Sequence, residues 1–255
     1  MRGLGWLFFA FLLLYLILPM LAPVVYSFSR MWLDVLPQGF TLDWYARIAR
    51  DPKYVEAGLL SLRIALMAVA TNIVVGVPTA YAAYTWAGRA GEGLRRLLQV
   101  LPLLVPPLVV GLGFLLAFNR PPLSLSGTLW IVVLGHAALG FPFFFRTVYA
   151  GLAGLEVGLL MEAARASGAG LWARLRYVLV PNLVPAVLSG SLVAFAISMG
   201  EFEITSMVAG FGTITLPLLL FQSLREDFRA ASAVAAVLLY VTLLALLGLT
   251  FLRRR

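Results

Sequence analysis

Six long apolar runs divide this chain, and they constrain its fold more than any other feature of the sequence. A helix needs roughly 20 apolar residues to cross the hydrocarbon core of a bilayer, and each run is close to that length. Because lipid offers backbone amides no hydrogen-bond partner, such segments must be helical. The runs therefore predict an all-α, polytopic membrane protein with six transmembrane helices, at residues 4–28, 57–86, 97–118, 129–149, 182–199 and 230–252.

The charged residues fall mainly between these runs and predict how the chain is oriented. They make up 12% of the sequence, about half the share found in soluble domains. With a cytoplasmic N-terminus, the inner segments carry the whole net charge of +8, as the positive-inside rule expects. We therefore predict two cytoplasmic termini in the cytoplasmic (inner) membrane. No basic stripe is interleaved with stacking aromatics, so the charge indicates topology and we expect no nucleic-acid partner.

The residue types present exclude several kinds of chemistry. The chain has no cysteine and one histidine, so it cannot form a disulfide or build the usual cysteine- and histidine-rich metal centres. Its one lysine, Lys53, lies outside the predicted spans, and the phosphate-loop spacing GxxxxGK[ST] is absent. We therefore expect no metal, no cofactor and no enzymatic activity in this chain. ATP hydrolysis would require a separate polypeptide.

His136 lies inside the predicted span at 129–149. An ionisable residue within a span can act as a proton relay or line a substrate pathway. The other interpretation is a buried imidazole bonded to a neighbouring backbone group or hydroxyl. The sequence leaves both open, and His136 is kept as a candidate residue of the substrate pathway.

Proline interrupts the second, third, fourth and fifth predicted spans, in places together with glycine. Proline removes a backbone hydrogen bond and clashes with the preceding turn. Membrane helices tolerate it where neighbours or water satisfy the freed carbonyls. Either these helices are kinked and line a path that opens and closes, or they reflect the general abundance of proline and glycine in membrane helices. The prolines concerned are Pro78, Pro102, Pro106, Pro107, Pro142 and Pro185.

A polar, arginine-bearing segment separates the fourth and fifth predicted spans. Its residues 158–172 predict a short helix with small side chains on neighbouring turns, a glycine suited to a left-handed cap, and a proline suited to the first turn of the next span. The segment is either an interfacial helix on anionic lipid or a docking surface for a partner protein. A glutamate and several alanines, in place of bulky apolar residues, favour docking. The residues of this pattern are Leu159, Glu162, Ala163, Ala166, Gly168 and Pro181.

The same segment resembles the cytoplasmic loop of type I ABC importer permeases, whose pattern is EAA, three residues, G, nine residues, then I-x-L-P. The resemblance implies the type I ABC importer permease fold, with six spans and one half of the pore per chain. It also implies that residues 162–168 form a coupling helix, which sits in a groove of a cytoplasmic ATPase and transmits nucleotide-driven closure to the spans. The matching positions are Glu162, Ala163, Ala164, Gly168 and Pro181, with Val178 and Val180 replacing isoleucine and leucine.

Further stretches resemble the spermidine/putrescine subgroup of these permeases: residues 40–45 (FTLDWY), and Leu216-Pro217 followed by Ala230-Ala231. The implied partners are cytoplasmic ATP-binding subunits that bind ATP and Mg, a second permease chain (identical or different), an extracytoplasmic solute-binding protein and membrane lipid. The organisation expected is a first helix and exterior segment over 1–56, a transmembrane domain over 57–252 and a basic tail at 253–255. The coupling loop would lie at about 156–181.

Two acidic residues, Glu201 and Glu203, follow the fifth predicted span. With His136 they are candidates for the substrate pathway, where they could attract a cationic solute. The alternative is solvated surface acids balanced by Arg225 and Arg229. Polyamine permeases carry adjacent aspartates near this position, and this chain departs from that pattern. The resemblance favours a polyamine as the solute, with iron, thiamine, a phosphonate or an inorganic anion as alternatives.

Two rival classes of membrane protein are weighed against the importer. A secondary transporter carries its own coupling site, usually with inverted repeats and intramembrane ionisable groups. Here His136 and Arg63 are the deep ionisable candidates, and no such repeat is visible. A structural or assembly protein would need neither clustered prolines nor the pattern at 162–181. The sequence therefore favours the permease subunit of an ATP-driven importer.

Overall fold

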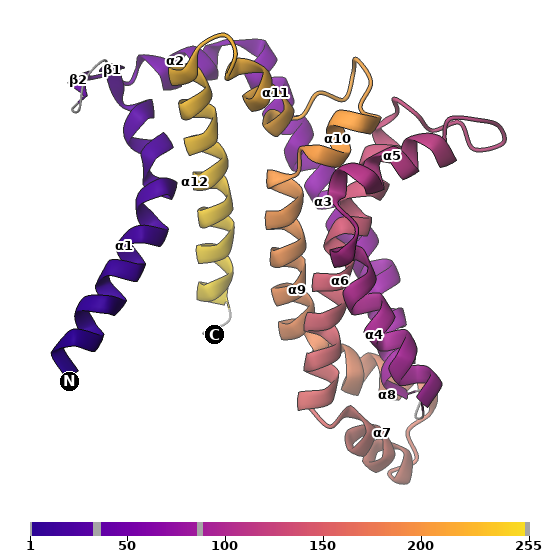
Figure 1. Cartoon of the computed structure of the whole chain (residues 1–255). Helices are drawn as coiled ribbons and strands as arrows, with labels where there is room; N and C mark the ends of the chain where they lie inside the picture. The colour runs from indigo at the N-terminus through magenta and orange to yellow at the C-terminus, as the bar shows by residue number, and fades with distance from the viewer. Residues whose placement is uncertain (1, 33–36, 86–88, 253–255) are drawn as a thin grey trace. The chain divides into compact units, whose positions relative to one another are not determined.

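Helices make up nearly all of the fold in this computed structural model, which describes residues 2–32, 37–85 and 89–252 (Figure 1). The predicted all-α class is confirmed, with one antiparallel hairpin in which Ser29 pairs with Phe40 and Met31 with Gln38. The predicted basic tail at 253–255 lies outside the described residues.

In chain order the elements are α1 (Arg2–Ser27), β1 (Ser29–Met31), β2 (Gln38–Phe40), α2 (Asp43–Arg50), α3 (Pro52–Thr85), α4 (Arg89–Leu104), α5 (Pro107–Ala117), α6 (Leu129–Gly154), α7 (Val157–Ala166), α8 (Leu171–Arg174), a π-helical turn η1 (Leu175–Leu179), α9 (Val180–Gly200), α10 (Glu203–Val208), α11 (Leu216–Ser223) and α12 (Phe228–Leu252).

Five helices are long and apolar enough to cross a membrane within the part of the chain that the structure describes. Each contains one of the predicted apolar runs, or nearly all of it, because the length and hydropathy of a run already determine whether it can span. These helical stretches are Gly5–Ser27, Pro52–Thr85, Leu129–Gly154, Leu171–Gly200 and Phe228–Gly248.

The sixth predicted span, at 97–118, is divided between two helices. α4 ends at Leu104 and α5 begins at Pro107. Pro106 and Pro107 have no N–H to donate to the preceding turn, and the residue before a proline disfavours helical backbone. A proline is tolerated where α5 starts. With 11 residues, α5 is about 16 Å long, roughly half of a bilayer core, so the six-span count stays a prediction.

The helix that contains the fifth predicted span begins at Leu171 instead of residue 182. α8 leads directly into the π-helical turn η1 and then into α9. Pro181 cannot donate to the carbonyl four residues before it, and a π-helical turn is a common way for a helix to absorb such a break. The proline therefore sits within a longer helix.

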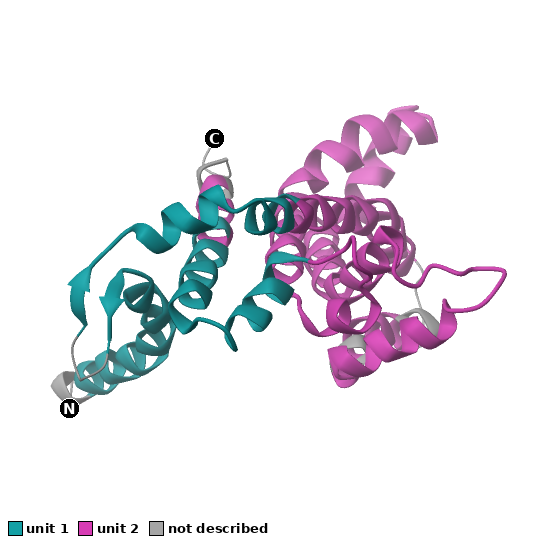
Figure 2. Ribbon diagram, turned by 90° about the horizontal axis from the view of Figure 1, so that it is seen from above, with its two compact units in different colours: residues 1–59, 215–241 teal, residues 60–214, 242–255 magenta. Residues whose placement is uncertain are grey.

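Two compact units make up the fold, and Figure 2 shows them in different colours. In the first unit, Tyr45 of α2 joins two helices: its hydroxyl lies 2.5 Å from Ser27 Oγ of α1 and 3.3 Å from the Tyr240 hydroxyl of α12. The guanidinium of Arg229 lies 5.0 Å from the centre of the Trp44 ring, a favourable cation–π distance. The first unit consists of residues 1–59 with 215–241, and the second of residues 60–214 with 242–255.

α6 forms the core of the second unit, where Phe144 and Phe145 are fully buried. Glycines let the neighbouring helices approach α6 closely. A Cβ added at Gly76 of α3 would lie 2.6 Å from Phe144 Cδ1, and one added at Gly151 of α6 would lie 2.4 Å from Ala186 Cβ of α9. Small residues at these positions therefore allow the close helix packing that membrane proteins depend on.

Candidate functional site

The predicted coupling segment is a short helix, α7, that follows α6 after a sharp turn. Glu156 makes this turn with a left-handed backbone, φ 46°, which is uncommon for a residue with a side chain. At the other end, Gly168 has φ 82°. Its amide donates to the Arg165 carbonyl and the Ala169 amide to the Ala164 carbonyl, both at 3.0 Å. These are the two bonds of a Schellman motif, so the left-handed cap predicted at Gly168 is confirmed.

α7 buries one face and exposes the other. Val157 and Met161 are buried in the hydrophobic core of the second unit. Glu162 and Ala163 are exposed, as is Leu159, with 63% of its surface accessible. We call the exposed residues Leu159, Glu162 and Ala163 the coupling face.

The residues of the predicted pattern are only partly brought together. Ala164 is half-buried on α7, and Gly168 is exposed just after that helix. Pro181 lies apart from them, exposed on α9. Trp172, at the start of α8, is 77% exposed.

α7 is attached to two membrane helices of the second unit. Leu175 and Leu179, in the N-terminal extension of α9, belong to the same hydrophobic cluster as Val157 and Met161. On the other side, the Gly158 amide donates to the hydroxyl of Tyr84 in α3, at 3.4 Å. α7 therefore contacts both α3 and the N-terminal extension of α9.

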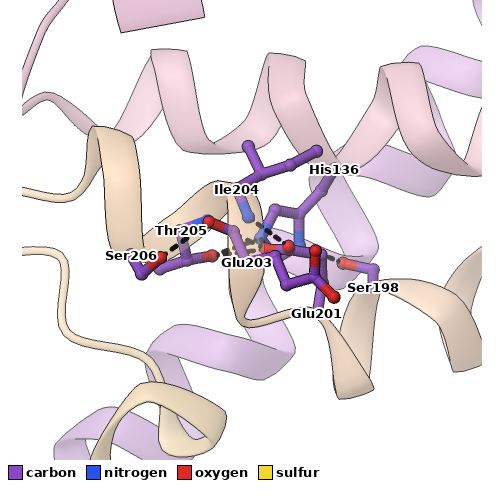
Figure 3. Close-up of polar contacts among 7 residues, drawn as sticks. All are labelled: His136, Ser198, Glu201, Glu203, Ile204, Thr205 and Ser206. Atoms are coloured by element: carbon purple, nitrogen blue, oxygen red, sulfur yellow. Dashed lines mark hydrogen bonds and ion pairs between the residues drawn. The ribbon is translucent and has the colours of Figure 1, made fainter. Parts of the chain in front are cut away.

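A second group of polar residues surrounds His136 of α6 (Figure 3). The His136 Nδ1 lies 2.7 Å from Ser198 Oγ, and its Nε2 lies 2.8 Å from Thr205 Oγ1 and 3.0 Å from Glu201 Oε2. The side chains of His136 and Glu201 are each only 2% exposed. This geometry matches the interpretation of a buried imidazole held by neighbouring hydroxyls. A place for His136 on the substrate pathway stays a prediction.

Glu201 caps the short helix α10. Its Oε1 accepts the Ile204 amide at 2.5 Å, and its Oε2 accepts the Thr205 amide at 3.1 Å and the Thr205 hydroxyl at 2.7 Å. A carboxylate is favourable at a helix N-terminus. Burial raises the pKa of the Glu201 carboxyl, but bonding and charge from His136, with the bonds from Thr205 and Ile204, hold that pKa below its usual range. Glu201 is therefore not the solvated surface acid considered as the alternative.

Glu203 forms a hydrogen bond to a different helix, α5. It is exposed on α10, and its Oε2 accepts the amide of Leu108, in the first turn of α5, at 3.2 Å. The structure thus brings His136 and Glu201 together and directs Glu203 towards α5. Arg229, expected as a counterion for these acids, lies 3.5 Å from Asp227.

Ser198 and Thr205 were missed by sequence reasoning. They lie three residues before and four residues after Glu201, on the two helices that flank its non-helical link. Their closeness in sequence to Glu201, together with the single histidine His136 in another span, was the only sign in the sequence that these hydroxyls could join a polar cluster.

Comparisons with known proteins agree with this architecture. A family model described as the binding-protein-dependent transport system inner membrane component matches residues 72–255. PhnV of Salmonella typhimurium (strain LT2), a permease protein assigned to 2-aminoethylphosphonate transport, is 33% identical over 244 residues, 95% of this chain and 91% of that protein. PotC of Escherichia coli (strain K12), a spermidine/putrescine transport system permease protein, is 28% identical over 94% of this chain and 90% of its own length.

Solved structures share the fold at low sequence identity. A chain of a bacterial ABC transporter involved in the import of the acidic polysaccharide alginate aligns with a TM-score of 0.71 at 15% identity, covering 98% of this chain and 95% of that one. A chain of the MetNI methionine ABC transporter aligns with a TM-score of 0.64 at 18% identity, covering 78% and 94%. The chain therefore belongs to the binding-protein-dependent transport system inner membrane component family, and it is the inner-membrane permease component of an ABC importer.

Proposed function

We propose that this permease moves a small solute carrying a protonated primary amine, with 2-aminoethylphosphonate as the first candidate and a polyamine as the second. The observation that carries the proposal is the 33% identity to PhnV over 95% of this chain, against 28% to PotC over 94%. The solutes named for these two relatives differ in size and in their anionic groups. They share an amine that is charged at neutral pH, which is the chemistry proposed for the solute of this chain.

The polar residues near α10 favour the first candidate. A polyamine carries several positive charges and no negative one, and the sequence offered Glu201 and Glu203 as its binding acids. Glu201 is buried and bonded to His136, and Glu203 is bonded to the first turn of α5. Both acids therefore bond to other parts of the protein, which supports a solute with fewer positive charges than a polyamine.

The partners that we propose follow from the family and from the coupling face. A separate cytoplasmic ATPase, which holds ATP and Mg, would dock on Leu159, Glu162 and Ala163 of α7. A second permease chain would complete the pore, and an extracytoplasmic solute-binding protein would deliver the solute. The family description, which specifies binding-protein-dependent transport, supports the last of these partners. The exposed coupling face supports the first.

Uptake by cells tests the proposed solute. Cells that lack this chain would be compared with the same cells carrying the wild-type chain on a plasmid, using radiolabelled 2-aminoethylphosphonate and radiolabelled putrescine. We expect the deletion to abolish high-affinity, ATP-dependent uptake of 2-aminoethylphosphonate and the plasmid to restore it.

The same cells are used for the control variant and for the result that would contradict the proposal. A Glu162→Arg variant should fail to restore uptake of any solute, because its ATPase would not dock. If uptake of both amines were unaffected by the deletion while uptake of thiamine or ferric iron were lost, the amine proposal would be wrong and one of the sequence-based alternatives would replace it.

A further inference from the structure

We infer that the buried His136–Glu201 pair is a clamp that makes α10 move as one body with α6 and α9. A movement of α7, at one end of the second unit, would thereby reach the first turn of α5. This inference assigns positioning roles to His136 and Glu201 in transport. It rests on the proposed docking of an ATPase at α7, but not on the identity of the solute.

The first step is mechanical continuity along one helix. The stretch Leu171–Gly200 has 30 residues, which corresponds to about 45 Å of helix. Figure 1 shows α7 at one end of α9 and α10 at the other. At the α7 end, Leu175 and Leu179 pack in the cluster that holds Val157 and Met161. A displacement of α7 would therefore reach α10 along one continuous helical stretch, which includes the π-helical turn η1.

The second step is the network at the far end of that helix. Ser198 belongs to α9, Thr205 to α10 and His136 to α6, and Glu201 lies in the short link between α9 and α10. Both nitrogens of the His136 ring and both carboxylate oxygens of Glu201 have partners within 3.1 Å. Three helices thus meet in one buried network whose main donors and acceptors are satisfied. Separating any two of them would leave a buried polar or charged group unpaired, which is strongly unfavourable.

The third step extends the clamp to α5. Glu203 Oε2 accepts the Leu108 amide at 3.2 Å, and the backbone of α10 fits closely against a glycine of α5. A Cβ added at Gly111 would lie 3.0 Å from Ile204 Cα and 3.0 Å from Met207 Cβ. On its other side, Ile204 contacts Gly135 of α6, where an added Cβ would lie 2.6 Å from Ile204 Cγ2. α10 is therefore wedged between α5 and α6, and movement of one helix must reach the other.

The burial of the pair argues against a direct role in binding solute. His136 and Glu201 are each 2% exposed, so a solute could not contact them without first dismantling the network. A fixed clamp therefore fits the geometry better than a binding group.

An engineered disulfide between α6 and α10 tests the clamp directly. A Cβ built at Gly135 lies 3.8 Å from Ile204 Cβ, within the range that a disulfide requires, and the natural chain contains no cysteine. The double variant Gly135→Cys/Ile204→Cys would be purified with its ATPase and reconstituted. MgATP hydrolysis and 2-aminoethylphosphonate uptake would then be measured in the oxidised and reduced states.

The reduced state of the same variant is the matched control. Because α10 is expected to stay fixed on α6 throughout the cycle, oxidation should change ATP hydrolysis and uptake by less than about twofold, which corresponds to about 0.4 kcal/mol of barrier. A loss of tenfold or more on oxidation, restored by a reductant, would mean that α10 must move against α6 and would overturn the inference. If the wild type takes up no 2-aminoethylphosphonate, the solute proposal fails alone, and the clamp is then tested with whichever solute is no longer taken up when this chain is deleted.

Substitution of Glu201 separates positioning from simple stability. In Glu201→Ala we expect a complex that assembles and hydrolyses MgATP, but whose uptake per ATP hydrolysed falls at least about tenfold. Glu201→Gln keeps the shape and one acceptor oxygen, so it should recover part of the coupling. Glu56→Gln, an exposed carboxyl of the first unit, is the control and should behave like the wild type. A Glu201→Ala complex with the wild-type ratio of uptake to hydrolysis would contradict the proposed role.

Discussion

At the scale of single residues, the two acids Glu201 and Glu203 show how local context decides what a carboxylate does. They are two positions apart in the sequence, yet one is buried against His136 and the other is exposed and caps α5. Glu201 lies in the non-helical link that follows α9, whereas Glu203 is the first residue of α10, so the two side chains meet different neighbours. Neighbouring charges in a sequence are therefore a weak sign of a shared binding site.

The charge of Glu162 is expected to matter for docking and not for folding. Its side chain is exposed on α7, and surface substitutions of this kind usually change stability little. Reversing the charge in Glu162→Arg should leave the protein inserted and folded but weaken ATPase binding at least about tenfold, a loss of 1.4 kcal/mol or more. Co-purification of the ATPase with each variant measures this, with Glu162→Gln as the milder comparison. Full transport by Glu162→Arg would remove Glu162 from the coupling role.

Gly168 is expected to tolerate alanine far better than proline. Its φ of 82° costs an alanine about 1–2 kcal/mol. Proline, with φ fixed near −65°, cannot adopt this backbone and also lacks the N–H that bonds to Arg165. Gly168→Pro should therefore insert normally but lose ATPase docking and uptake, whereas Gly168→Ala keeps most of both. Wild-type uptake by Gly168→Pro would show that the Schellman cap is not needed for coupling.

At the scale of helices, close packing around α6 is the feature most sensitive to added volume. Gly76→Ala would place a methyl group 2.6 Å from Phe144 Cδ1, and Phe144 is fully buried. Overpacking of this kind costs about 1–3 kcal/mol. We expect a clear drop in the thermal unfolding temperature of the detergent-purified protein.

The control for this prediction is a glycine with open space around it. A Cβ added at Gly113 of α5 meets no atom within 4 Å, so Gly113→Ala should change stability by at most about 1 kcal/mol. Equal unfolding temperatures for the Gly76 and Gly113 variants would mean that the α3–α6 contact relaxes without cost.

The sequence predicted some elements better than others, for physical reasons. Long apolar helices were predictable because the cost of exposing backbone to lipid depends only on the length and hydropathy of one segment. The cap at Gly168 was predictable because its signal is local. α10, with six residues, is too short to show a hydrophobic period. The break between α4 and α5 was marked by its prolines, but whether prolines kink a helix or end it depends on its neighbours.

At the scale of the whole molecule, the family and the short helix α7 were predictable, and the buried contact between His136 and Glu201 was not. His136 and Glu201 are separated by 65 positions in the sequence, and no periodicity or local motif relates residues so far apart. Such contacts arise from helix packing, which one sequence does not reveal. The solute is equally hidden, because function depends on a site added to a fold that many transporters share.

The most direct test of the central claim is purification of this chain from native membranes in mild detergent, followed by mass spectrometry of the proteins bound to it. We expect a phosphate-loop ATPase and a second permease chain, either a copy of this one or a relative, to co-purify with the wild type. We also expect the Glu162→Arg variant to lose the ATPase but keep the second permease. A wild-type chain that emerges without any ATPase would contradict the assignment of α7 as the docking site of an ATP-driven importer.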